Sequence, residues 1–81
     1  MKKVELKEFL FRVLSDYFQS FELISFEHTD GHKKYDYTAK VRVYMGADSS
    51  VDTFYVRYER RQGVERVVVL NENEVIETFL L

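Results

Sequence analysis

Near the start of the chain, apolar positions recur every three or four residues, which predicts an amphipathic helix over residues 3–20. The repeating positions are Leu6, Phe9, Leu10, Val13, Leu14, Tyr17, Phe18 and Phe21. Charged and polar residues fall mostly on the opposite side. Phe11 lies off the apolar stripe, so we expect it to be half exposed or to make a contact of its own.

Beyond the helix the period changes to two, which predicts β-strands with one buried face. The clearest strand covers residues 34–45, and shorter patterns predict strands over residues 22–29, 51–60 and 64–70. In the clearest strand, the positions that should face inward are Tyr35, Tyr37, Ala39, Val41, Val43 and Met45. Four consecutive strands joined by short connections favour an antiparallel meander in the order 1-2-3-4.

Turn residues separate these strands and fix their expected registers. Asp30-Gly31 and Gln62-Gly63 predict two-residue hairpin turns, and residues 46–49 predict a four-residue loop. The expected pairs are Glu27–Lys34, Phe26–Tyr35 and Ile24–Tyr37, then Val41–Phe54, Ala39–Val56 and Tyr37–Tyr58, then Arg60–Glu65, Glu59–Arg66, Tyr58–Val67 and Val56–Val69. Apolar residues face apolar residues in all three hairpins, but Asp36 would oppose Glu59.

The C-terminal segment can be interpreted in two ways. Asn71 and Glu74 have the spacing of a capping box, which predicts a short helix after residue 74. A fifth strand is the alternative. The predicted fold class is therefore α+β: an N-terminal amphipathic helix packed on a four-stranded antiparallel meander sheet, with a short C-terminal helix or a fifth strand.

Composition agrees with one domain over residues 1–81. Apolar residues make up 46% of the chain and aromatic residues 16%, which is enough for one core layer. Cysteine is absent, which excludes a disulfide or thiolate site and suits a reducing cytoplasm. No apolar run approaches the length of a signal peptide core or a membrane span, so we expect a cytoplasmic protein without membrane contact.

No motif in the chain carries a recognisable chemistry. His28 and His32 could bind a metal, but the expected turn would point them to opposite faces. Asp36 and Asp48 lack a trusted spacing to a base or a second carboxylate. We therefore expect no catalytic residue, no metal site and no cofactor. A small hydrolase or metal site built around Asp36, Asp48 or His28 is the least favoured hypothesis.

The outward positions of the sheet are more informative. Basic groups outnumber acids there, and Tyr55, Val68 and Leu70 form an apolar island. The candidate binding residues are Lys40, Arg42, Tyr44, Tyr55, Arg57, Arg66, Val68 and Leu70. Lys34 and Arg61 belong to the same predicted face.

Three explanations of this face compete. The C-terminal segment could cover the island, a protein partner or second copy could bind it, or its tyrosines and arginines could bind single-stranded nucleic acid. The acidic isoelectric point, about 5.6, weakens the last explanation. We predict a small non-enzymatic interaction protein that binds another protein or forms a homodimer, with a sheet-based single-stranded nucleic-acid binder as the alternative.

Overall fold

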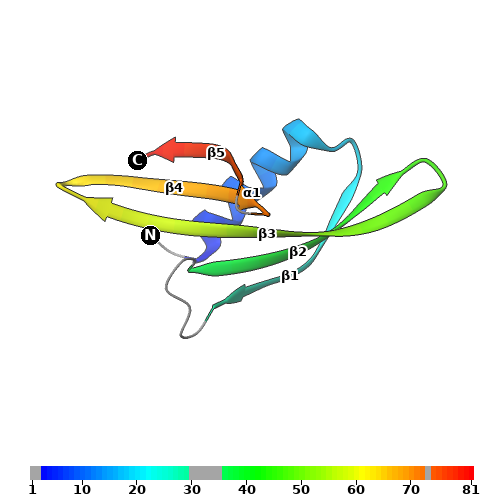
Figure 1. Cartoon of the computed structure of the whole chain (residues 1–81), viewed down its shortest axis with the longest axis horizontal. Coiled ribbons are helices and arrows are strands. Elements are labelled where there is room, and N and C mark those ends of the chain that lie inside the picture. Colours follow the sequence, from blue (N-terminus) through cyan, green and yellow to red (C-terminus); the bar gives the residue numbers. More distant parts are fainter. Residues whose placement is uncertain (1–2, 30–35, 73) are drawn as a thin grey trace.

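The computed structural model describes residues 3–29, 36–72 and 74–81, and within them it has one helix and one five-stranded antiparallel sheet (Figure 1). The elements are α1 (Lys3–Tyr17), β1 (Phe21–His28), β2 (Tyr37–Met45), β3 (Asp48–Arg61), β4 (Val64–Asn71) and β5 (Glu74–Leu80). Strand order in the sheet is β1-β2-β3-β4-β5. The predicted α+β class and meander are confirmed, but the sheet has five strands rather than four.

The helix ends three residues early, at Tyr17, and that residue of the predicted stripe is 55% exposed rather than buried. Its four buried residues are Leu6, Leu10, Val13 and Leu14. The backbone N–H of Phe18 still bonds the carbonyl of Leu14 at 2.8 Å. The Phe18 ring then packs edge-on against Phe54 of β3, with ring centroids 6.2 Å apart.

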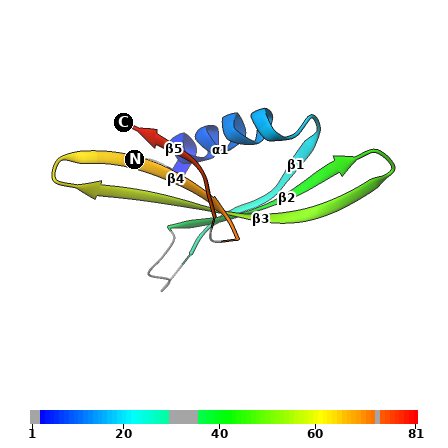
Figure 2. The ribbon, with the colours of Figure 1, turned by 45° about the horizontal axis from the view of Figure 1, so that its top comes forward.

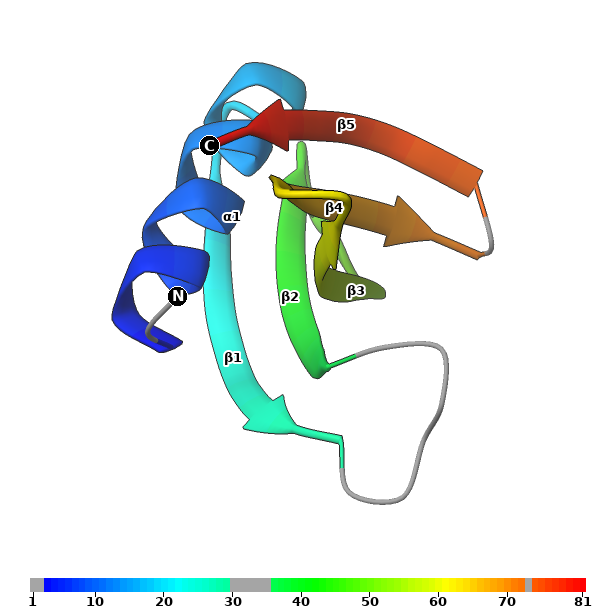
Figure 3. The same ribbon diagram turned by 90° about the vertical axis from the view of Figure 1, so that its left-hand side faces the viewer.

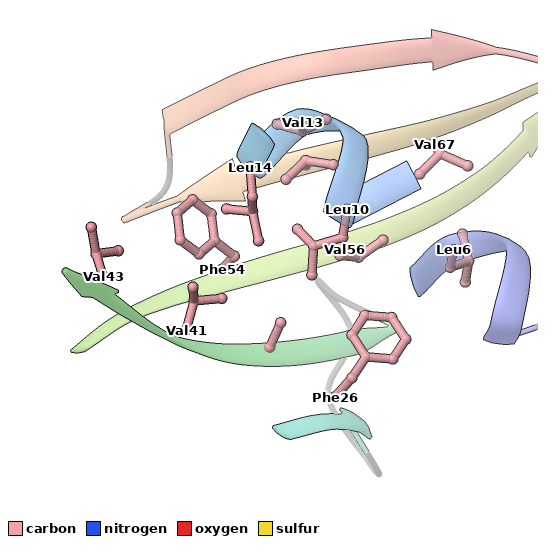
Figure 4. Packing of buried hydrophobic residues seen from close by; sticks show 12 residues of the cluster. Leu6, Leu10, Val13, Leu14, Phe26, Val41, Val43, Phe54, Val56 and Val67 are labelled. Carbon is pink, nitrogen blue, oxygen red and sulfur yellow. The ribbon is translucent and has the colours of Figure 1, made fainter. Parts of the chain in front are cut away.

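The core lies between α1 and one face of the sheet, which we call the inner face (Figure 4). Its buried residues are Leu6, Leu10, Val13, Leu14, Phe26, Ala39, Val41, Val43, Phe54, Val56, Val67 and Val69. Strands β2, β3 and β4 each contribute alternate residues, as a period of two requires. The opposite side of the sheet is the outer face.

The sheet curls around the helix, so that α1 lies beside both β1 and β5 (Figure 3). Phe9 contacts Phe79 of β5 with ring centroids 4.8 Å apart, and Phe11 contacts Phe21 of β1 at 5.6 Å. Residues two apart on a helix point to opposite flanks, so these two rings join the helix to both edge strands. The predicted contact for Phe11, which is 40% exposed, is therefore confirmed.

The predicted C-terminal helix is wrong, and the fifth strand that was its alternative is confirmed. Asn71 pairs with Glu74 across a turn in which Glu72 has a positive φ of 50°. The residues of the apparent capping box thus belong to a hairpin. Two physical reasons favour the strand: β-branched and aromatic side chains dominate this segment, and a short helix would leave the edge of β4 unpaired.

The β3–β4 hairpin has the predicted register in every pair. Arg60 pairs with Glu65, and Glu59 pairs with Arg66. Gln62 and Gly63 have φ values of 52° and 79°, the two positive values of a type I′ turn. This turn matches the right-handed twist of its strands, which explains why the sequence signal was sufficient.

The β2–β3 hairpin is shifted by two residues from its predicted register. Its turn contains only Gly46 and Ala47, with a positive φ of 66° at Gly46, as in a type II′ turn. Ala39 therefore pairs with Phe54, and Tyr37 pairs with Val56. The tighter turn adds ladder pairs at the hairpin end, and an even shift leaves every side chain on its predicted face.

The β1–β2 hairpin differs most from prediction. Phe26 pairs with Ala39 rather than Tyr35, a shift of four residues. The predicted turn Asp30-Gly31, together with Lys34 and Tyr35, lies outside the described residues. A bulge leaves Ile24 without a pairing partner, between the Leu23–Val41 and Ser25–Lys40 pairs. Ile24, predicted to face inward, is consequently 43% exposed.

Candidate binding face

The outer face is defined by the alternation of side chains along β3. Phe54 and Val56 are buried against the helix. Tyr55 and Arg57, which alternate with them along the strand, point to the opposite face of the sheet. Helix α1 packs on the inner face alone, as the side view shows (Figure 2). The predicted sorting of side chains onto two faces therefore holds for β3.

The eight candidate residues share this face but form two groups. Tyr55, Arg57, Arg66, Val68 and Leu70 lie together on β3 and β4, where Tyr55 pairs with Leu70 and Arg57 pairs with Val68. Lys40, Arg42 and Tyr44 follow β2 toward the Gly46-Ala47 turn and pair with Thr53, Val51 and Ser49. The shifted register of this hairpin accounts for the separation.

In the β2 group, two side chains are bound within the chain. Glu22 of β1 accepts a hydrogen bond from the Tyr44 hydroxyl at 3.0 Å. The same carboxylate lies 3.5 Å from Nη1 of Arg42, and both of these side chains are about half exposed, at 56% and 43%. Glu22 thus contacts both Arg42 and Tyr44. Because the ion pair is exposed to solvent, it contributes little to the free energy of unfolding.

Strand β5 extends the apolar island on the β3–β4 side. Val75 pairs with Leu70 and is 55% exposed, and Leu80 pairs with Arg66 and is 76% exposed. Sequence reasoning missed both residues because it favoured a helix there. The high β-propensity of this segment was the signal that could have found them. Since β5 lies beside β4, the proposed covering of the island by the C-terminal segment is not seen.

The strongest electrostatic feature is a carboxylate between two guanidinium groups. Oε1 of Glu59 lies 2.9 Å from Nε of Arg57, and Oε2 lies 2.5 Å from Nε of Arg66. The Glu59 side chain is only 11% exposed. Burial alone would raise the pKa of Glu59, but the hydrogen bond from Arg66 and the arginine charges outweigh it, so the pKa lies below its ordinary value of 4.5.

The groups with potential for catalysis or metal binding each make structural contacts. Asp36 accepts a hydrogen bond from the backbone N–H of Tyr58 at 2.7 Å, which replaces the expected clash with Glu59. The His28 ring packs edge-on against Tyr37. Asp48 lies in β3 and pairs with Met45. Among the described residues, no three His, Asp or Glu side chains gather as metal ligands, and His32 lies outside them.

A shallow hollow lies between the end of α1 and the end of β2. Its lining residues are Tyr17, Phe18, Gln19, Val43, Tyr44, Met45 and Gly46. On the other side of the core, partial burial and then the nearby Glu65 carboxylate raise the pKa of Tyr58. A tyrosine with a raised pKa is a poor proton donor or nucleophile at neutral pH.

Comparison with known proteins does not assign a function. No protein-family model matches the chain, and neither a curated protein nor a solved structure matches it. The single helix within the described residues, α1, is too short and too polar to cross a membrane.

Proposed function

We propose that this chain is a small non-enzymatic protein that binds another protein, or a second copy of itself, through the outer face of its sheet. The observation that carries the proposal is the combination of half-buried apolar and arginine side chains on that face. Tyr55, Val68 and Leu70 lie beside Arg57 and Arg66, and the exposed Val75 and Leu80 extend them. Tyrosine and arginine are enriched at protein interfaces, where aliphatic neighbours exclude water.

The other surfaces of the sheet are less suited to a partner. The inner face is filled by α1. The edge strand β5 has a bulge at Ile76, whose carbonyl accepts a hydrogen bond from the Tyr17 hydroxyl at 3.1 Å. The edge strand β1 has its own bulge at Ile24 and carries Glu22. Bulges and charges are the devices by which proteins prevent edge-to-edge pairing, so a partner should prefer the outer face.

The test compares capture of partners from native lysate by the wild type and by two double variants. Tyr55→Ala with Arg57→Ala should lose the captured protein while keeping the wild-type circular dichroism spectrum. A matched control, Lys7→Ala with Arg12→Ala on the exposed side of α1, should retain it. Retention of every captured protein by the Tyr55/Arg57 variant would contradict the proposal.

The homodimer form of the proposal is tested by sedimentation equilibrium. Self-association should be present in the wild type and the control and absent from the Tyr55/Arg57 variant. Single-stranded nucleic acid is the alternative ligand, and titration with oligothymidylate at low salt separates it from a protein partner. Tighter binding of the oligonucleotide than of any captured protein would favour that alternative over our proposal.

A further inference from the structure

The Arg57–Glu59–Arg66 cluster is a preorganised pair of cationic groups on the outer face. Both arginines approach Glu59 through Nε: Oε2 accepts a hydrogen bond from Arg66, and Oε1 forms an ion pair with Arg57. The arginine side chains remain 37% and 41% exposed, whereas Glu59 beneath them is 11% exposed. A guanidinium has five N–H donors in a rigid fork, so the Nη edge of each arginine remains available for a second acceptor.

The charges of the cluster do not cancel. Arg61 is near enough that its charge also lowers the pKa of Glu59. Three guanidinium charges stand against the carboxylate of Glu59 and that of Asp36, which accepts a hydrogen bond from the backbone N–H of Tyr58, so one positive charge is in excess. Within the part of the chain that the structure describes, Arg57 and Arg66 form no ion pair except those with Glu59. The surface therefore favours an anionic ligand, which would gain hydrogen bonds assisted by charge.

The surroundings favour an anion carried by protein. Val68 pairs with Arg57 across the strands, and Leu80 pairs with Arg66. Aliphatic side chains suit the apolar residues of a peptide, whereas nucleic-acid bases need aromatic rings to stack on, and Tyr55 is the one aromatic in the β3–β4 group.

We propose that Arg57 and Arg66, held in place by Glu59, bind carboxylates of an acidic partner segment whose apolar residues lie on Val68 and Leu80. This inference rests on the function proposed above and names the chemistry of the partner. Glu59 acts as a positioning residue, because its two carboxylate oxygens face the Nε atoms of the two guanidinium groups.

The test uses the full chain and a fluorescein-labelled peptide in which glutamate and valine alternate. Fluorescence anisotropy should show saturable binding of this peptide and none of the same peptide with glutamine in place of glutamate. Replacement of both arginines by lysine (Arg57→Lys with Arg66→Lys) keeps the charge and removes the forks. This variant should weaken binding about tenfold, the equivalent of one charge-assisted hydrogen bond.

Glu59→Gln separates positioning from bulk charge. The substitution makes the protein more positive by one charge, so simple attraction predicts tighter binding of the acidic peptide. Loss of the carboxylate that orients the guanidinium groups predicts weaker binding, which is the result we expect. Arg12→Ala removes a cation that lies over the Phe9 ring on the helix, at 5.2 Å, and should leave binding unchanged. Thermal melts confirm that each variant is folded.

Three results would overturn the inference: no binding of the acidic peptide, tighter binding by Glu59→Gln, or tighter binding of oligothymidylate than of the peptide. The double variant Arg57→Lys with Arg66→Lys distinguishes failure of the anion-site inference from failure of the proposed function. If it captures the native partner as well as wild type while the Tyr55/Arg57 variant does not, the outer face is the interface and the cluster is not its anion site.

Discussion

The inner and outer faces of β3 differ in what a side chain does there, although the residues concerned are neighbours in the chain. Phe54 and Val56 are 2% and 0% exposed and pack under α1. Tyr55 and Arg57 are partly exposed and lie among the arginines and aliphatic residues of β4. The strand alternates between a surface needed for folding and a surface that folding leaves available. Stability and binding should therefore be separable by substitutions one residue apart.

The largest expected effect is on the inner face. Phe54→Ala should lower the free energy of unfolding by about 3–5 kcal/mol, because it removes a buried ring and leaves a cavity. Tyr55→Ala, one residue later on the outer face, should cost less than about 1 kcal/mol. Urea denaturation followed by circular dichroism measures both. Equal losses would show that the two faces are equally part of the core.

An intermediate effect is expected where the helix meets the edge strands. Phe79→Ala should cost about 2 kcal/mol because its ring is half buried against Phe9. A double-mutant cycle on Phe9 and Phe79 should give a coupling free energy of about 0.5–1.5 kcal/mol. A coupling near zero would mean that β5 does not pack against the helix.

Smaller effects are expected at the hairpin turns, which set the two faces. Gly63 has a φ of 79° and nothing within 4 Å of an added Cβ, so Gly63→Ala should cost about 1 kcal/mol through backbone strain alone. Gln62→Asn should stabilise the protein by about 0.5 kcal/mol, since asparagine tolerates the left-handed conformation better. Thermal unfolding compares the variants, and a stabilising alanine at position 63 would refute the type I′ turn.

The smallest effect depends on pH and tests the ion pairs of Glu59. Its pKa is lower in the folded than in the unfolded chain, so its stabilising contribution is complete above the ordinary value of 4.5 and is lost as pH falls through the folded-state value. The stability advantage of wild type over Glu59→Gln should therefore shrink from about pH 6 to about pH 3. An advantage that grows on acidification would contradict these ion pairs.

The sequence predicted the faces better than it predicted the registers. Alternation over β2 and β3 was enough to place Val41 and Val56 inside and Arg57 outside, because a register shift of two or four residues preserves the side of the sheet. The turn signal Gln62-Gly63 was enough to predict the register of the β3–β4 hairpin. Residues 46–50 all suit a turn, so nothing local distinguished a two-residue turn from a four-residue loop.

Two features depended on how neighbouring strands pair. The bulge at Ile24 arises from the pairing of β1 with β2, and no pattern in the sequence of β1 alone predicts it. The segment after Asn71 has a plausible capping box, and its β-propensity together with the otherwise unpaired edge of β4 decides in favour of a strand. The candidate face was therefore predicted on β3 and β4 but not on β5, where Val75 and Leu80 extend it.

The most direct test of the outer face as a partner surface uses the absence of cysteine from the chain. Thr78→Cys places one thiol on the outer face opposite Val68, and Val69→Cys places one at a fully buried inner position. Alkylation rates are measured for the purified variants and again in native lysate. We predict that Cys at position 78 reacts as a free thiol when the pure protein is dilute enough to be monomeric and is protected in lysate, while Cys at position 69 reacts only on unfolding. Equal, fast reaction at position 78 in both conditions would contradict a partner on the outer face.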